Sequence, residues 1–559
     1  MARIRVLVMS GMLVSTCAAS ALAAWPASPL LNLPVCTAAG RQTLSVIVGD
    51  GASGAIAVWE DSRGGNSIYA QRVNEAGIPR WAANGVPVAT GGGSKVWCDA
   101  VSDGAGGVVV AWAEYRNGSE SDIFAQHLNG GGAPLWATNG VPVCTASGNQ
   151  YAPKLTPDGS GGVVLVWTDE RVAPFSDFHA QRLNSAGDTQ WALNGVALTT
   201  GLIAGQAPAV AGDDSAGVIV AWHGSVNGSL LHPYVQRLDA AGQRRWGKDG
   251  VLLATVSTQY DPCLVRDGEG GAIVMWTDLR DGDGNTGVSY AQRVSADGVP
   301  QWTAGGVALS DSPGDHGWNA LVSDAGGGAI AVWSDLSSTE IRAQRVNGTG
   351  ATSWPLVGVS VGAASNGMSL FRAVSDGSGG VLVTWMDERN GDSDVYLQRV
   401  DFAGVTLWPT DGVPVSTAPL AQMGPELIAD GTGGAVVGWS DFRLADDLHV
   451  YAQRVSASGA LGGSVLGVPR IERLGLVWVR ATGNPGHAAV ALECQLAGPA
   501  PALLEVFDVS GRCRAKQDLV GGRAPVQVRI PVAGWSPGVY MVRLAQGAER
   551  ASTRLVLTR

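Results

Sequence analysis

Short runs of apolar residues recur along the chain, and each run ends at a tryptophan. One copy reads Val108-Val109-Val110-Ala111-Trp112 and follows a polar turn that begins at Asp103. The copies stand roughly 52 to 57 residues apart, a period in the range of long propeller repeats. Their tryptophans are Trp59, Trp112, Trp167, Trp222, Trp276, Trp333, Trp385 and Trp439.

Each copy contains the signals of four strands. An Asp-x-x-x-Gly turn, such as Asp103 to Gly107, joins the first strand to the second, because glycine supplies the positive φ of a tight hairpin. The run that ends at the tryptophan is apolar on both faces, which is typical of a strand packed between neighbours. A third strand alternates, as in Tyr69-Ala70-Gln71-Arg72-Val73, and a Gly-Val-x-Val segment closes the unit. Four such strands cannot bury both faces alone, so we expect the copies to stack radially as propeller blades.

The last copy lacks its closing strand, and the missing segment occurs at the other end of the chain. Trp25 and the stretch Asn32-Leu33-Pro34-Val35-Cys36-Thr37 resemble the closing segment Asn139-Gly140-Val141-Pro142-Val143-Cys144-Thr145. An N-terminal strand that completes the last blade would leave no unpaired sheet edge. The sequence therefore predicts an all-β protein whose main part is a closed, eight-bladed β-propeller of four-stranded blades.

The chain divides into three predicted parts. Residues 1–24 have the features of a secretory signal peptide, with Arg3 and Arg5, an apolar core, and the cleavage-site pattern Ala21-Leu22-Ala23. We expect the propeller at 25–462, and at 463–559 a linker and a small immunoglobulin-like β-sandwich. The strands predicted for that sandwich include 503–509, 526–530, 538–544 and 553–557.

Two segments of the C-terminal domain resemble a known family. They are Val506-Phe507-Asp508-Val509-Ser510-Gly511-Arg512 and Ser536-Pro537-Gly538-Val539-Tyr540-Met541-Val542-Arg543-Leu544. With the basic residue Arg559, they are similar to C-terminal sorting domains of the type IX secretion system and to flagellar-hook-capping-type immunoglobulin-like domains. The resemblance implies outer-membrane secretion machinery as a partner and a secreted or cell-surface location. The repeats resemble uncharacterised bacterial propeller repeats, which imply an architecture and no activity.

Composition and charge exclude one class of partner. The net charge is -11 and no basic stripe is present, so the electrostatic signature of a nucleic-acid-binding protein is missing. No Cys/His cluster has zinc-site spacing, and we expect no cofactor and a monomeric protein. Cys494 and Cys513 are the best candidates for a disulfide, with buried thiols as the alternative.

An Asp-x-Arg pair follows the tryptophan in most copies, as in Asp169 and Arg171. Arginines of this kind could grip a carboxylate ligand. A catalytic site is used once, however, whereas this pair recurs from blade to blade. We therefore interpret the pair as a structural salt bridge or turn cap.

Departures from the repeat are better candidates for a ligand site. The fourth copy replaces Asp-x-Arg with His223-Gly224-Ser225, and the sixth carries His316 before its hairpin. Four aromatic residues also stand just upstream of hairpins: Trp97, Tyr151, Tyr260 and Trp318. If these segments share one rim, the aromatic rings could stack on sugars; if they point inward, they belong to the core.

One loop has the alternating oxygen groups of a calcium site. Asp281, Asp283 and Asn285 are spaced as Ca²⁺ ligands, but Gln292 stands where an EF-hand has its bidentate glutamate. A solvated turn is the favoured interpretation, and a Ca²⁺ site is the alternative.

Two functions remain open on these grounds. The first is a secreted or cell-surface binding or adhesion propeller without catalysis, with a glycan or a surface protein as its partner. It rests on the even repeats and on the lack of a nucleophile or phosphate-loop motif. The second is a secreted carbohydrate-active hydrolase or lyase with its site at the propeller mouth. It requires two carboxylates, or a Tyr/His pair, that converge from different blades. No catalytic residue is predicted, and binding is the preferred hypothesis.

Overall fold

The computed structural model describes residues 25–462 and 478–557, apart from short gaps. The gaps are 117, 173–175, 200–202, 205–207, 214, 226–229, 281–286, 312–315, 336–338, 364–370, 445–446, 482–488, 497–500, 509–511, 521–525, 537 and 547–548. The chain divides into two compact units, Met1–Ser464 and Val465–Arg559. The expected signal peptide, 1–24, lies outside the described residues. Within the described part of the chain, no helix is long and apolar enough to cross a membrane.

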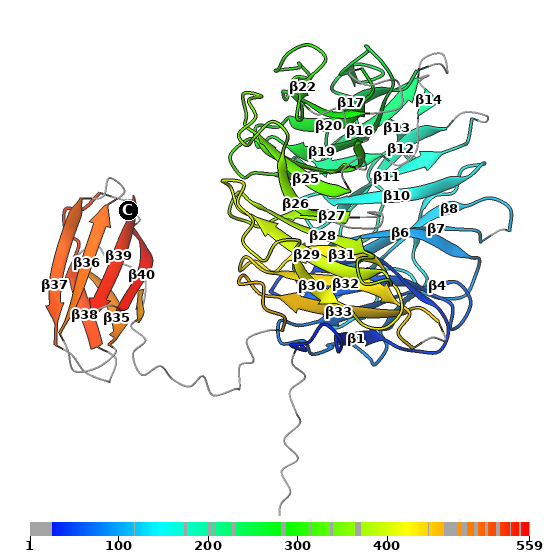
Figure 1. Ribbon diagram of the computed structural model, residues 1–559. Helices are drawn as coiled ribbons and strands as arrows, with labels where there is room; N and C mark the ends of the chain where they lie inside the picture. The colour runs from blue at the N-terminus through cyan, green and yellow to red at the C-terminus, as the bar shows by residue number, and fades with distance from the viewer. Residues whose placement is uncertain are drawn as a thin grey trace, which may run out of the picture. The chain divides into compact units, whose positions relative to one another are not determined.

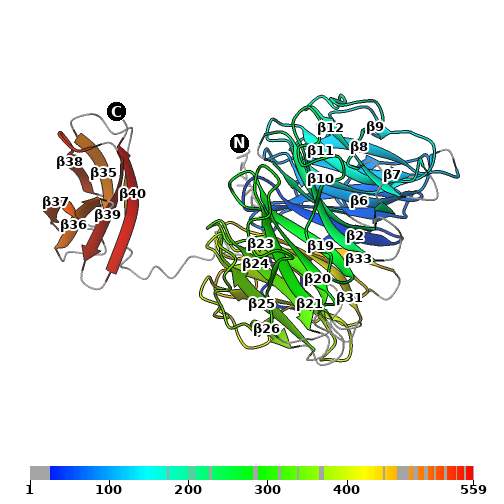
Figure 2. The same cartoon turned by 90° about the horizontal axis from the view of Figure 1, so that it is seen from above.

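The first unit consists of eight antiparallel sheets that follow one another around a ring (Figures 1 and 2). The innermost strands are β2 (Gln42–Gly49), β6 (Lys95–Ser102), β10 (Gln150–Pro157), β15 (Ala209–Gly212), β19 (Gln259–Arg266), β23 (His316–Ser323), β27 (Phe371–Ser375) and β31 (Gln422–Ala429). The second strands are β3 (Ala55–Asp61), β7 (Val108–Glu114), β11 (Val163–Asp169), β16 (Val218–Ser225), β20 (Ala272–Asp278), β24 (Ala329–Asp335), β28 (Val381–Asp387) and β32 (Ala435–Asp441).

The outer half of each sheet is made by a third and a fourth strand. The third strands are β4 (Ser67–Val73), β8 (Asp122–Leu128), β12 (Asp177–Leu183), β17 (His232–Leu238), β21 (Val288–Val294), β25 (Glu340–Val346), β29 (Asp394–Val400) and β33 (His449–Val455). The fourth strands are β5 (Val86–Ala89), β9 (Val141–Cys144), β13 (Val196–Ala197), β18 (Val251–Leu252), β22 (Val307–Ala308), β26 (Val359–Ala363), β30 (Val413–Ser416) and β1 (Leu33–Cys36). Blade 4 has an additional strand, β14 (Ile203–Ala204), which pairs with β16.

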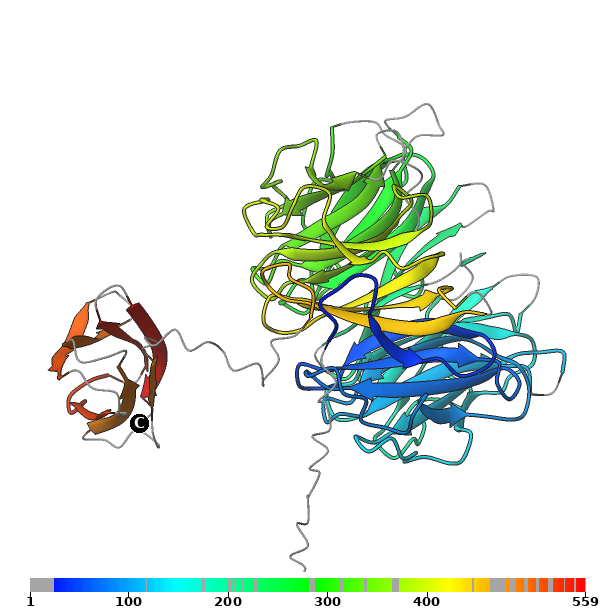
Figure 3. The ribbon, with the colours of Figure 1, turned by 60° about the horizontal axis from the view of Figure 1, so that its bottom comes forward.

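The ring is closed by the N-terminal strand, as the sequence predicts. β1 pairs with β33 of the eighth blade, so residues from both ends of the propeller share one sheet (Figures 1 and 3). β2 of the first blade also contacts β31 of the eighth blade. Trp25 is buried, and its Nε1 donates to Glu75 O at 3.1 Å, as Trp81 Nε1 donates to Gly130 O at 3.0 Å in the next blade. The eight-bladed, all-β prediction is confirmed.

The Asp-x-x-x-Gly turn is built by its own side chain. Asp103 Oδ1 accepts from the backbone N of Ala105 at 2.7 Å and of Gly107 at 2.8 Å. A Cβ at Gly107 would lie 2.3 Å from Leu128 O and from Asp103 Oδ2, so only glycine fits there. This arrangement joins the first and second strands of the blade and explains why the pattern recurs.

The Asp-x-Arg pair holds the blade together. Asp169 Oδ2 accepts from Trp167 Nε1 at 2.9 Å and from Arg171 Nη2 at 2.6 Å. Arg171 Nη2 also donates to Asn194 O at 2.9 Å, which ties the pair to the segment before the fourth strand. Equivalent contacts of Asp61, Asp278, Asp387 and Asp441 with their tryptophans have the same form. The geometry supports the structural interpretation of this motif.

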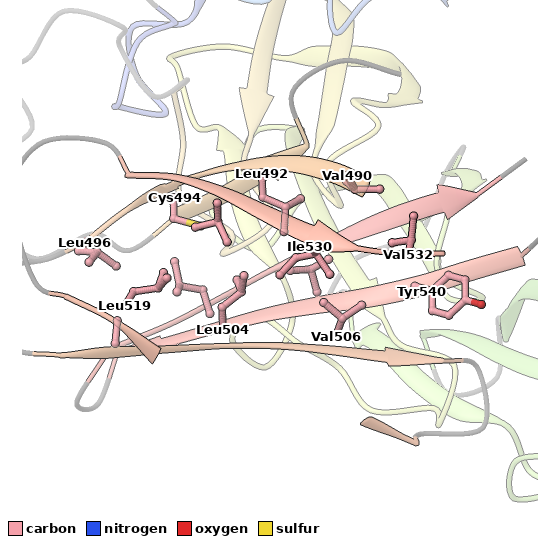
Figure 4. Packing of buried hydrophobic residues seen from close by; sticks show 14 of the residues in the cluster. Val490, Leu492, Cys494, Leu496, Leu504, Val506, Leu519, Ile530, Val532 and Tyr540 are labelled. Carbon is pink, nitrogen blue, oxygen red and sulfur yellow. The ribbon is translucent and has the colours of Figure 1, made fainter. Parts of the chain in front are cut away.

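The second unit is a two-sheet sandwich. One sheet contains β34 (Trp478–Ala481), β35 (Ala489–Gln495) and β38 (Val526–Pro531); the other contains β37 (Cys513–Leu519), β36 (Ala502–Asp508), β39 (Gly538–Gln546) and β40 (Glu549–Leu557). Side chains from both sheets meet in one apolar core (Figure 4).

The expected disulfide between Cys494 and Cys513 is not formed. Cys494 lies in the core on β35, whereas Cys513 is exposed at the start of β37 in the other sheet, where its Sγ donates to Ala515 O at 3.3 Å. All six cysteines in the described part of the chain are thiols. The buried-thiol alternative applies to Cys494.

Candidate functional site

Several innermost strands carry a bulge near their first residues. The register shifts between Val96 and Asp99 in β6, and between Tyr151 and Lys154 in β10. Trp97, inside the first bulge, has a φ of 54°, which is unusual for a bulky residue. Bulges re-aim side chains, and a strained residue of this kind is often found at a functional site. The end of the ring at which the innermost strands begin is therefore the candidate location of a functional site.

Trp97 and Tyr151 form an aromatic pair across blades 2 and 3. Their ring centroids lie 5.3 Å apart at an interplanar angle of 45°, and Trp97 is 49% exposed. The Tyr151 hydroxyl donates to Glu170 Oε1 at 3.2 Å. The backbone N of Trp97 donates to Glu60 Oε1 of blade 1 at 3.0 Å. Two of the four predicted aromatic residues thus meet, flanked by two carboxylates from different blades.

Glu60 lies beside a cavity of about 290 Å³, which is also lined by Arg41, Thr43 and Asn66. Burial raises the pKa of Glu60, and the hydrogen bond from Trp97 N and the charge of Arg41 oppose that shift. Burial also raises the pKa of Tyr151, and the neighbouring Glu170 adds to the effect. We call Trp97, Tyr151, Glu60 and Glu170 the aromatic rim site. It offers an exposed ring face together with hydrogen-bond acceptors.

The other predicted residues lie elsewhere or outside the described part. Tyr260 occupies the same register position in β19 as Tyr151 in β10, two blades further around the ring. His223 is half-buried; burial lowers its pKa, and the charge of Asp261 in the next blade opposes that shift. His223 therefore faces the bulge of blade 5, as Glu60 faces that of blade 2.

The remaining predicted residues lie partly or wholly outside the described part of the chain. The backbones of His316 and Trp318 belong to β23, but their side chains lie outside the described residues. Asp281, Asp283 and Asn285 lie wholly outside them. Among the residues that are described, no group of three or more His, Cys, Asp or Glu side chains could hold a metal ion.

A second feature was not predicted from the sequence. Eight equivalent positions on the innermost strands face the residue that precedes each buried tryptophan, and four of them are charged. The charged ones are Asp99, Lys154, Arg372 and Glu426, and the others are Val46, Ala209, Cys263 and Ala320. The charged residues depart from the uncharged pattern of the other four blades, and this departure is visible only when the copies are aligned by strand register.

The four charged residues converge from blades 2, 3, 7 and 8. Arg372 Nη2 lies 2.9 Å from Glu426 Oε1, and Leu155 N donates to Asp99 Oδ2 at 3.0 Å. Burial raises the pKa of Glu426; the charges of Arg372 and Lys154 oppose that shift, and Asp99 adds to it. We call these four residues the central charged cluster. It brings two carboxylates and two cations together from innermost strands.

Comparisons with known proteins identify no family. No protein-family model matches the chain, and no curated protein matches it. Among solved structures, puromycin hydrolase is 13% identical with a TM-score of 0.42, over 75% of this chain and 61% of that one. The chain thus spans less than two thirds of the length of that enzyme. An ulvan lyase is 10% identical with a TM-score of 0.41, over 76% of this chain and 97% of the lyase. The α-L-arabinanase of Penicillium chrysogenum is 11% identical with a TM-score of 0.36, over 66% of this chain and 94% of the arabinanase. Likenesses this weak carry no conclusion about activity.

Proposed function

We propose that this protein is a secreted or cell-surface binding propeller that recognises a glycan at the aromatic rim site. The observation that carries the proposal is the half-exposed Trp97, held on a left-handed bulge against Tyr151. Sugar rings present C–H groups on one face, which pack against aromatic rings, and hydroxyls at their edges. A preformed ring pair with convergent polar groups is the usual form of such a pocket.

Each polar neighbour has a role in this proposal. Glu60 accepts hydrogen bonds from sugar hydroxyls beside Trp97, whereas both oxygens of Glu170 already accept, from Tyr151 Oη at 3.2 Å and from Asn149 Nδ2 at 3.0 Å. Their contacts with Trp97 N and Tyr151 Oη hold the two rings in place before a ligand arrives. Binding then costs little side-chain entropy, which favours affinity.

The location follows from the resemblance of the C-terminal domain. We propose that this domain engages outer-membrane secretion machinery and that the propeller acts outside the cell. The sandwich fold of the second unit supports the proposal, because it has the strands expected of such a domain.

A second function is favoured by one specific observation. Asp99 and Glu426 come from different blades, and the charge of Asp99 adds to the rise that burial causes in the pKa of Glu426. A carbohydrate-active hydrolase or lyase would require two carboxylates that converge in this way. Burial raises the pKa of Glu426, which is the direction that a general acid requires. Arg372 and Lys154 would then contact an anionic group of the substrate.

The experiment is a glycan-array screen of the full mature chain, followed by affinity measurement for each hit and a test for released product. Trp97→Ala should weaken binding at least tenfold, because a lost ring contact of about 1.4 kcal/mol is a factor of ten. Phe402→Ala is the matched control, since Phe402 is 61% exposed on blade 7. Equal binding by wild type and Trp97→Ala would refute the rim site. New reducing or unsaturated sugar ends that disappear in Glu426→Gln would establish the enzyme instead.

A further inference from the structure

A second cavity, of about 420 Å³, lies on blade 2 and the start of blade 3. Its lining includes Arg116, Glu120, Asp122, Phe124, Thr145 and Ser147. None of these residues belongs to the aromatic rim site or to the central charged cluster. The volume is within the range of small-molecule pockets, and two carboxylates and two hydroxyls face one space.

Asp122 is the unusual member of this lining. It is only 7% exposed, and its carboxylate makes no hydrogen bond or ion pair with any described residue. A buried carboxylate without a partner is costly, so such groups are nearly always paired. The equivalent aspartates of other blades follow that rule: Asp177 accepts from Thr199 Oγ1 at 2.7 Å, and Asp394 accepts from Asn390 Nδ2 at 2.7 Å.

The sequence explains why the Asp122 carboxylate has no hydroxyl donor. Thr199 stands five residues after Asn194 in blade 3, and the residue five positions after Asn139 in blade 2 is Cys144. A thiol is a weak donor, and the Cys144 Sγ lies 3.6 Å from the carbonyl oxygen of Asn194. Asp122 therefore lacks the hydroxyl that satisfies its counterpart, and its carboxylate remains directed at the cavity.

The cations nearby are already engaged. Arg116 Nη2 lies 2.9 Å from Glu114 Oε2, and Lys95 Nζ lies 3.6 Å from Glu114 Oε1. Within the described part of the chain, Glu120 Oε2 accepts a single hydrogen bond, from the backbone N of Gly148 at 3.0 Å. Burial raises the pKa of Asp122; the charge of Glu120 adds to that shift, and the charge of Arg116 opposes it. Three carboxylates (Glu114, Glu120 and Asp122) thus stand against two cations (Arg116 and Lys95), which leaves one negative charge that a bound cation would balance.

We propose that this cavity binds an amino sugar, with its ammonium group between Asp122 and Glu120. A bare divalent cation needs oxygens at about 2.0 to 2.6 Å on several sides, whereas this space has the size of a small organic molecule. An ammonium group donates three hydrogen bonds, which two carboxylates and a hydroxyl can accept. The hydroxyls of Thr145 and Ser147 line the cavity and could contact sugar hydroxyls, whereas the Phe124 ring is stacked under the Arg116 guanidinium, whose Cζ lies 3.8 Å from the ring centroid. This site is independent of the proposed function of the aromatic rim site.

The test is calorimetric titration of the full mature chain with D-glucosamine at neutral pH. D-glucose and N-acetyl-D-glucosamine serve as neutral probes, Nα-acetyl-lysine methylamide as a second ammonium source, and calcium chloride as a metal probe. We expect glucosamine to bind at least tenfold more tightly than either neutral sugar. Equal affinity for the neutral sugars, tighter binding of the lysine derivative, or Ca²⁺ binding that displaces glucosamine would each overturn the proposal.

Three variants locate the site. Asp122→Asn should weaken glucosamine binding at least tenfold, whereas Asp177→Asn, the matched control in blade 3, should leave it unchanged. Cys144→Thr should also weaken it, because the new hydroxyl would occupy the carboxylate as Thr199 does in blade 3. Trp97→Ala should have no effect. If Trp97→Ala abolishes glucosamine binding and Asp122→Asn does not, the amine binds at the aromatic rim site and the proposal is wrong.

Discussion

Replacing Trp25 by alanine tests whether the N-terminal strand closes the ring. Trp25 is 3% exposed, and it packs against Gly77 in the third-to-fourth-strand turn of blade 1. Trp81 has the same place one blade further on: it is 8% exposed and packs against Gly132. Because their surroundings match, the two tryptophans should contribute equally to stability, although one is the first described residue of the chain.

The magnitude follows from this packing. A buried aromatic residue replaced by alanine costs about 3 to 5 kcal/mol, and the lost Nε1 hydrogen bond adds about 1 kcal/mol. With an unfolding entropy of about 2.1 cal/mol/K per residue, a ring of roughly 440 residues has about 0.9 kcal/mol/K. Trp25→Ala should therefore lower the melting temperature by about 4 to 6 °C if the ring unfolds cooperatively.

Differential scanning calorimetry of the mature chain would measure this, since it can separate the transition of the propeller from that of the C-terminal sandwich. Trp81→Ala is the control and should give the same decrease. A decrease for Trp81→Ala with none for Trp25→Ala would show that β1 does not hold the eighth blade. No decrease for either variant would refute the packing argument itself.

Three further predictions concern stability. Burial lowers the pKa of His179 to about 4, so neutral His179 stabilises the folded state above about pH 6.5. This contribution to the free energy of unfolding, about 3 kcal/mol in all, is lost as the pH falls toward 4. His179→Tyr, which restores the residue found at Tyr69, should flatten the dependence of the melting temperature on pH between 7 and 4.5; an unchanged slope would contradict this. Arg171→Met should destabilise by about 3 kcal/mol or more in urea titrations, since it leaves Asp169 buried without its cation, whereas Arg245→Met, at an exposed ion pair, should cost about 1 kcal/mol or less. A reductant should shift the melting temperature by less than about 1 °C, because the described cysteines are thiols; a large drop would reveal a disulfide.

The candidate site was partly visible in the sequence. Trp97 and Tyr151 could be selected because each is an aromatic residue just upstream of a predicted hairpin. Glu60 follows the buried Trp59 directly, where most copies have a small or neutral residue, so alignment of the copies could have found it. Asp122 carries no such signal, since acidic residues are common at its position, and the contact of Glu170 with Tyr151 has no local pattern in the sequence.

The repeat period, the turn glycines and the N-terminal copy of the closing segment were enough to determine a closed, eight-bladed all-β ring, because each of these is a local property of the chain. Which residues meet was decided by the tertiary structure alone. The bulge in β6 turns Trp97 outward and sets it against Tyr151, 54 residues away in the chain. The register of the innermost strands brings Asp99 toward Glu426, and Cys144 leaves Asp122 without the hydroxyl that its counterpart has. These contacts depend on distances between blades, and no local pattern in a sequence encodes those distances.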